Sequence, residues 1–146
     1  MKTVRQRQSG MLMIEVMVTI IIVSFGLLGV AGVILNSLKA NESSYGRAQA
    51  VWLANDIIDR MRANRTAAES INLPYNLALS ATPTGTGVPA TDLTSWLAAL
   101  AATLPSGQGS VSIVSATKKV TVTVQWDDSR ASGGSQSQQF VVETRL

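Results

Sequence analysis

Cysteine and histidine are both missing from this chain of 146 residues. Without cysteine the chain can form neither a disulfide bond nor a thiolate metal site. Histidine is the commonest general base and the commonest metal ligand in proteins, so its absence removes two routes to catalysis together. We therefore expect a protein that is not an enzyme, with no catalytic residue, no metal ion and no cofactor.

Charge is also scarce, at 14% of the residues, and the net value of +3 comes from one end of the chain. Three basic residues precede Gly10, and no acidic residue precedes Glu15. The other nine of the 12 basic residues are balanced by the nine acidic ones. This balance argues against a nucleic-acid partner, which would need clustered basic residues. The one adjacent pair, Lys118 and Lys119, is typical of edge-strand protection.

The longest apolar run extends from Gly10 to Leu38 and reads GMLMIEVMVTIIIVSFGLLGVAGVILNSL. Its single charged residue, Glu15, lies near its start. A helix needs about 20 apolar residues to cross a bilayer, so this run is long enough to span a membrane. The basic residues in front of the run predict a cytoplasmic N-terminus, with everything after Leu38 on the opposite side.

A basic segment before an apolar run resembles a secretory signal peptide, but the position of the expected cleavage site differs. A signal peptide has its small-residue cleavage site after the apolar region. Here the small residues Ser9 and Gly10 lie before the run. A cut between Gly10 and Met11 would remove the basic residues and leave the apolar helix attached.

The segment Gly10-Met11-Leu12-Met13-Ile14-Glu15 resembles the class III signal of type IV prepilins, whose usual form is Gly-Phe-Thr-Leu-Ile-Glu. The chain departs from that form at the three positions after Gly10, and all three substitutes are apolar. The resemblance implies cleavage after Gly10 by a prepilin peptidase, which also methylates the new terminus at Met11. It further implies that Glu15 pairs with the terminal amine of a neighbouring subunit during filament assembly.

Physical chemistry supports an assembly role for Glu15. A lone acid inside a bilayer costs about 2.5 to 3.5 kcal/mol on insertion scales, and it usually has a partner and a function. The alternative is a side chain that only extends to the lipid headgroups.

Three glycines, Gly26, Gly29 and Gly32, recur at every third position and share one broad face of the predicted helix. One interpretation is close packing, or simple tolerance of glycine in a membrane helix. The other is a soft spot at which the helix stretches once it leaves lipid for a filament. Resemblance to pilins favours the soft spot.

The helical pattern continues beyond the apolar run, with no proline between Met11 and Arg65. Gly46 is the expected soft spot in this half. The apolar stripe of the half repeats at spacings of three and four and consists of Ala50, Leu53, Ala54, Ile57, Ile58 and Met61. We therefore expect one long helix whose first half spans a membrane and whose second half lies on a small domain.

The rest of the chain predicts a small α+β domain. Residues 64–90 contain three prolines and predict a loop. A helix is expected to begin at Thr91-Asp92 and to end before Pro105. Period-two alternation predicts three antiparallel strands at residues 110–115, 119–126 and 138–145. The chain then divides into a leader (1–10), a transmembrane and assembly half of the helix (11–38), an amphipathic half (39–65) and a periplasmic α+β domain (66–146).

Several separated phrases narrow the resemblance to the PilV-type minor pilins, known as type IV pilus modification proteins. They are GLLGVAG at 26–32, RAQAVWLANDIIDRMRANR at 47–65, the Leu-Pro-x-Gly-x-Gly phrase at 104–109 and VTVQWDD at 122–128. The resemblance implies a pilin-like fold and a role in pilus assembly, within a priming or tip complex. Relatives often carry cysteine in the domain, so it is open how this chain holds its 64–90 loop.

The implied partners are other minor pilins, the major pilin, the prepilin peptidase and methyltransferase, inner-membrane lipid and the pilus assembly machinery. The implied location is a single pass through the inner membrane, with a periplasmic C-terminal domain, followed by the pilus. Two other functions stay open: a type II secretion pseudopilin, and a DNA-uptake pilin that binds DNA. Asp127 and Asp128 are interpreted as a turn, since one acidic pair lacks the oxygen ligands of a calcium site.

Overall fold

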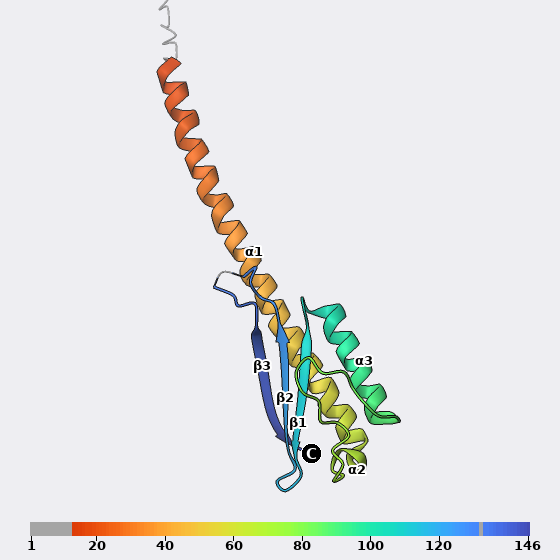
Figure 1. Cartoon of the computed structure of the whole chain (residues 1–146). Helices are drawn as coiled ribbons and strands as arrows, with labels where there is room; N and C mark the ends of the chain where they lie inside the picture. The colour runs from red at the N-terminus through yellow and green to blue at the C-terminus, as the bar shows by residue number, and fades with distance from the viewer. Residues whose placement is uncertain (1–12, 132) are drawn as a thin grey trace, which may run out of the picture. The chain divides into compact units, whose positions relative to one another are not determined.

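The computed structural model of the chain describes residues 13–131 and 133–146 and divides into two compact units, Met1–Leu38 and Lys39–Leu146. The elements, drawn in Figure 1, are the helices α1 (Met13–Ala63), α2 (Arg65–Ala68) and α3 (Val88–Thr103) and the strands β1 (Gln108–Val114), β2 (Lys119–Trp126) and β3 (Gln138–Arg145). This confirms the predicted α+β, pilin-like fold, with a long N-terminal helix, a small domain, a shorter helix and three antiparallel strands.

In the first unit, the described residues all belong to α1. They contain no proline, and Glu15 in the first turn interacts favourably with the positive end of the helix dipole. By length and composition, α1 is able to cross a membrane. Its large apolar side chains in this unit are exposed, as expected of a segment that contacts lipid or other chains.

The second unit contains a sheet in the order β1-β2-β3, with both neighbouring pairs antiparallel (Figure 1). The bounds of β2 and β3 are those that the alternation of the sequence predicts. The first strand begins earlier than predicted, at Gln108, because Gln108 and Gly109 already pair with Gln125 and Val124. The sequence pattern missed this extension, since glycine interrupts the alternation.

One face of the sheet packs on the apolar stripe of α1 and on α3. The predicted stripe is confirmed, because all six of its residues, from Ala50 to Met61, are buried. In β2 the side chains of Val120, Val122, Val124 and Trp126 are buried, as their alternation predicts. Trp96 of α3 is fully buried as well, and its Nε1 donates a hydrogen bond to the Leu53 carbonyl oxygen at 2.8 Å. This bond attaches α3 to the backbone of α1.

The expected start of the shorter helix at Thr91-Asp92 is wrong, because α3 begins at Val88. Proline lacks a backbone N–H and has a fixed φ, which the first turn of a helix tolerates, so Pro89 lies within the first turn of α3 rather than before the helix. Gly87, at the N-cap, has a φ of 91°, a conformation that glycine adopts without strain.

The interpretation of Lys118 and Lys119 as edge-strand protection is also wrong. Lys119 is the first residue of β2, which is the central strand, and Lys118 lies in the turn before it with a φ of 53°. Both ammonium groups form ion pairs instead, Lys118 with Glu69 at 2.6 Å and Lys119 with Glu143 at 2.7 Å. The pairing order of strands is a tertiary property that the adjacent lysines did not reveal.

Candidate functional site

The residues proposed for processing and assembly lie at the start of the chain. Gly10 and Met11, the predicted cleavage and methylation positions, lie outside the described residues. Glu15 lies in the first turn of α1 and is exposed. Its backbone carbonyl accepts a hydrogen bond from Thr19 Oγ1 at 2.7 Å. The structure leaves the Glu15 carboxylate accessible to an amine from outside the described part of the chain.

The three glycines predicted as a soft spot lie in uninterrupted α-helix. Apart from the neighbouring backbone of α1 itself, a Cβ added at Gly26, Gly29 or Gly32 would meet no heavy atom of the described residues within 4 Å. Packing inside the chain therefore does not require glycine at these positions. If close packing requires glycine at these positions, the packing partner must be a neighbouring molecule. The soft-spot interpretation stays a prediction.

The question of how a cysteine-free chain holds residues 64–87 is answered by Tyr75, which is fully buried. Its hydroxyl donates a hydrogen bond to Asp92 Oδ2 in α3 at 2.6 Å. The same hydroxyl accepts a hydrogen bond from Asn64 Nδ2, at the end of α1, at 3.3 Å. Burial, followed by the bond to Asp92, raises the pKa of Tyr75 to about 12. One phenol thus joins the loop to both helices.

The same loop is also attached to the first strand of the sheet. Leu77 and Val111 exchange backbone hydrogen bonds of 2.8 and 2.9 Å. Next to this bridge, the backbone N–H of Ile113 donates to Asn76 Oδ1 at 2.7 Å. These bonds satisfy part of the outer edge of β1. The loop is therefore held by ordered hydrogen bonds rather than by a covalent link.

A cluster of charged residues connects α2, the β1–β2 turn and the C-terminus. Glu69 pairs with both Arg65 and Lys118, and the two hydrogen bonds hold the pKa of the Glu69 carboxyl below its ordinary value. Arg65 Nη2 also donates to the carbonyl oxygen of Leu146 at 2.7 Å. On the adjacent strands, the bond from Lys119 lowers the pKa of Glu143 in the same way. The cluster fastens the end of the chain to the domain.

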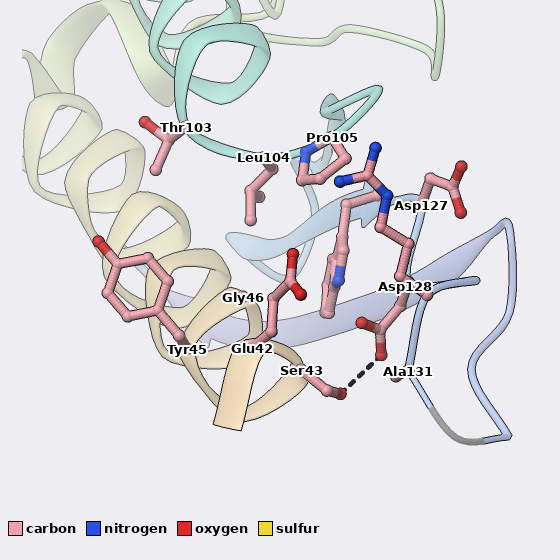
Figure 2. A pocket seen from close by; sticks show the side chains of 12 residues that line it. Glu42, Ser43, Tyr45, Gly46, Thr103, Leu104, Pro105, Asp127, Asp128 and Ala131 are labelled. Atoms are coloured by element: carbon pink, nitrogen blue, oxygen red, sulfur yellow. Dashed lines mark hydrogen bonds between the residues drawn. The ribbon is translucent and has the colours of Figure 1, made fainter. Parts of the chain in front are cut away.

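In the second unit, residues of α1, of the α3–β1 segment and of the segment after β2 line a cavity of about 200 Å³. Figure 2 shows the side chains that line it. On its wall, Ser43 Oγ donates a hydrogen bond to Asp128 Oδ2 at 2.7 Å, and Asp128 is 9% exposed. Hydrogen bonds from the Ser129 side chain and from its backbone N–H, the latter 2.9 Å from Asp127 Oδ1, lower the pKa of the Asp127 carboxyl. The two aspartates thus make separate contacts, one to α1 and one within a turn.

Glycines have packing roles that sequence reasoning missed. A Cβ on Gly109 would overlap the Trp96 ring and lie 2.8 Å from Leu100 Cδ1. A Cβ on Gly107 would overlap the Leu100 carbonyl oxygen at the end of α3. The Leu-Pro-x-Gly-x-Gly phrase was the available signal, because two closely spaced glycines after a helix indicate close backbone approach. The expected soft spot Gly46 lies in continuous helix, and a Cβ there would lie 3.4 Å from Trp126 Nε1, about an ordinary contact distance.

Within the described ranges, no group of three or more acidic side chains is arranged to hold a metal ion. The polar networks around Tyr75 and Glu69 are made of paired donors and acceptors and fasten helices, strands and loop to one another.

Comparison with known proteins agrees with this picture. Residues 33–91 match a protein-family model described as Type IV pilin Tt1218, or Tt1218-like. The match covers the end of the apolar run, the amphipathic half of α1, the loop and the first residues of α3. No curated protein and no solved structure matches the chain. The family match supports a type IV pilin, and the long apolar N-terminal helix fits a class III signal.

Proposed function

We propose that this type IV pilin acts as a minor pilin of the PilV type, in a priming or tip complex of the pilus. The single observation that carries the proposal is the match of residues 33–91 to a type IV pilin family. That match implies assembly with other pilins and with the pilus machinery, and the pilin family is structural rather than enzymatic.

In this proposal the chain is made as an inner-membrane precursor with a periplasmic domain. Prepilin peptidase cuts it after Gly10, and Met11 becomes the methylated terminus. Glu15 then pairs with the terminal amine of a neighbouring subunit. Support comes from the position of Glu15, which is exposed in the first turn of a helix long and apolar enough to cross a membrane. A charge at that depth is stabilised by a cationic partner.

The proposal also gives a role to the three glycines of α1. Because a Cβ built at Gly26, Gly29 or Gly32 would contact no described residue outside its own stretch of helix, packing within the described part of the chain gives no reason to keep glycine there. Each glycine lowers helix stability by up to about 1 kcal/mol relative to alanine. We infer that this segment stretches when the subunit moves from lipid into the filament.

The distribution of charge argues against the DNA-uptake alternative. Ion pairs with carboxylates involve the basic residues Arg60, Arg62, Arg65, Lys118 and Lys119. DNA binding depends on lysines and arginines that are free to contact phosphates. Submicromolar DNA affinity of the chain at physiological salt would contradict the proposal.

The test is to express the tagged full-length chain in piliated cells, shear off the pili and identify the chain in them by mass spectrometry. A strain without the prepilin peptidase is the matched control. Recovery with pilus components, absent from the control, is the expected result. Recovery only with a type II secretion pseudopilus would replace the proposal by the pseudopilin alternative.

A further inference from the structure

The cavity of about 200 Å³, whose lining Figure 2 shows, has no role in the proposed function and carries charges of both signs. The charged groups on its wall are the carboxylates of Glu42, Asp127 and Asp128 and the guanidinium of Arg130. None of them forms an ion pair with a described residue. A molecule with one positive and one negative group would therefore find an unpaired counter-charge for each.

A hydrogen-bond donor on the same wall also lacks a partner. Trp126 is 2% exposed, and its Nε1 has no hydrogen-bond partner among the described residues. An indole N–H can only donate, and a buried donor without an acceptor is unfavourable. Gly46 of the cavity wall lies beside this nitrogen, since a Cβ built there would be 3.4 Å from it. An oxygen atom of a bound molecule would satisfy the donor.

The α1 part of the cavity wall follows closely after the apolar run in the chain. No residue between Val16 and Leu38 is charged. At about 1.5 Å per residue, Glu42 and Gly46 lie about 6 and 12 Å beyond Leu38 along the helix. The headgroup region of a bilayer is about 5–8 Å thick on each side of the hydrocarbon. With Leu38 at the edge of the hydrocarbon, this wall of the cavity begins among the lipid headgroups.

We propose that the cavity binds the headgroup of a phospholipid that carries a primary ammonium beside its phosphate, as phosphatidylethanolamine does. The ammonium pairs with the carboxylates of the wall, above all with Glu42, which no described residue engages. The phosphate accepts hydrogen bonds from Arg130 and from Trp126 Nε1. Leu104 and Pro105, which also line the cavity, contact the glycerol part of the lipid.

The two charges of the headgroup select this phospholipid over others. Phosphatidylglycerol carries a phosphate without a cation, so the acidic wall repels it. Phosphatidylcholine carries a cation without an N–H, so it cannot donate a hydrogen bond to a carboxylate.

The same wall argues against a protein occupant. A lysine or arginine of another protein would pair with the carboxylates but would leave Arg130 and Trp126 Nε1 without an acceptor. The cavity is also smaller than the roughly 300–1,000 Å³ of sites for drug-sized molecules, which fits one headgroup.

This inference rests on the membrane anchoring in the proposed function and names the lipid that the domain recognises there. Flotation of the full-length chain with liposomes separates the two proposals. A chain that does not float would contradict the membrane anchoring and, with it, this inference. A chain that floats but shows no headgroup preference would contradict this inference alone.

The first experiment measures that preference on the full-length chain in detergent micelles. Phosphatidylethanolamine, phosphatidylcholine and phosphatidylglycerol are added in equal amounts, and native mass spectrometry counts the lipids that stay bound. We expect about fivefold more phosphatidylethanolamine than either other lipid, an effect of the size that a partly exposed ion pair provides. Equal retention of the three lipids would overturn the proposal. So would displacement of the lipid by an equal concentration of free O-phosphoethanolamine, since the ligand would then be the soluble compound.

The second experiment assigns the preference to the cavity. Glu42→Gln and Arg130→Gln change exposed side chains, and each should reduce the preference for phosphatidylethanolamine by about fivefold. The matched controls are Asp59→Asn and Arg47→Gln, which remove exposed charges of α1 outside the cavity wall. Far-UV circular dichroism confirms that each variant is folded. An unchanged preference in both cavity variants, or an equal loss in the controls, would contradict the site.

The third experiment identifies the occupant in piliated cells. A photoreactive benzophenone amino acid replaces Thr103, an exposed residue of the cavity wall. After illumination, mass spectrometry should find the chain joined to phosphatidylethanolamine. Cross-links to another protein without any lipid adduct would assign the cavity to a protein partner and overturn the proposal.

Discussion

The hydroxyl of Tyr75 lies 2.6 Å from Asp92 Oδ2, and through this hydrogen bond the middle of the loop is attached to the second turn of α3. Because Tyr75 is fully buried and Asn64 approaches the same hydroxyl from the end of α1, three segments converge on one oxygen atom. In this cysteine-free chain, a buried phenol and a carboxylate fasten the loop.

Replacing Tyr75 by phenylalanine should therefore destabilise the domain. The substitution keeps the ring but leaves Asp92 and Asn64 without their shared partner, which costs about 1–3 kcal/mol. The measurement is thermal or denaturant unfolding of the full-length chain in detergent, followed by tryptophan fluorescence. Tyr45→Phe is the matched control, since Tyr45 is 64% exposed, and its midpoint should be unchanged.

The hydrogen bond between Tyr75 and Asp92 also predicts that the domain loses stability at alkaline pH. The pKa of Tyr75 is raised from 10.0 to about 12 in the folded chain, so in that range the native state holds a proton that the unfolded state has lost. Stability should fall as pH rises from about 10 to about 12. If Tyr75→Phe and the wild-type chain lost stability equally over this range, the buried hydrogen bond would not be the cause.

Acid should weaken the charged cluster around Glu69. Its folded pKa is lowered from 4.5 by the hydrogen bonds from Lys118 and Arg65, so its contribution to stability is complete above pH 4.5 and is lost as pH falls through the folded value. Glu69→Gln should flatten the loss of stability below pH 4.5, measured by unfolding at a series of pH values. Glu42→Gln is the control, because Glu42 forms no ion pair among the described residues. A Glu69→Gln profile parallel to wild type would refute the effect.

Gly109→Ala should destabilise the core by about 1–3 kcal/mol, the usual cost of overpacking. The new methyl group would overlap the ring of Trp96, which cannot move freely because its Nε1 is bonded to the Leu53 carbonyl. The unfolding midpoint and the Trp96 environment, reported by near-UV circular dichroism, should both change. Ser112→Ala on the exposed face of the same strand is the control and should leave both unchanged.

Replacing Gly10 by a bulky residue such as leucine should block removal of the leader. In the proposed processing, a bulky side chain at position 10 would keep the peptidase from the backbone at the cut site. The intact mass of the chain recovered from membranes should then include residues 1–10, whereas wild type should begin at a methylated Met11. Ser9→Ala should be processed normally. A wild-type mass that retains the leader would disprove cleavage at this position.

Glu15→Gln should leave the chain inserted and processed but reduce its abundance in sheared pili by about tenfold or more. Loss of the proposed ion pair with a neighbouring subunit would account for a change of this size, since about 1.4 kcal/mol corresponds to a factor of ten. Quantitative mass spectrometry of pili and membranes measures the ratio, and Glu15→Asp should restore part of it. Equal abundance of Glu15→Gln and wild type in pili would mean that Glu15 has no pairing role.

Features that belong to one element were predictable. The apolar run and the stripe ending at Met61 follow from helical periodicity, and the bounds of β2 follow from alternation, because each pattern is a direct consequence of which face of an element is buried. The start of α3 was missed because Pro89 is compatible with either a loop or a first helical turn. The processing residues Gly10 and Met11 were identified by resemblance, and they stay predictions.

By itself, the sequence determined the long apolar helix with its lone Glu15, the amphipathic continuation and the strands of the small domain. These are local properties, set by side chains a few residues apart. Only the tertiary structure decided that β2 is the central strand, that Tyr75 reaches Asp92 and that Gly109 accommodates Trp96. Each of these depends on how elements distant in the chain pack together, and packing selects partners by shape and hydrogen bonding that no single periodicity records.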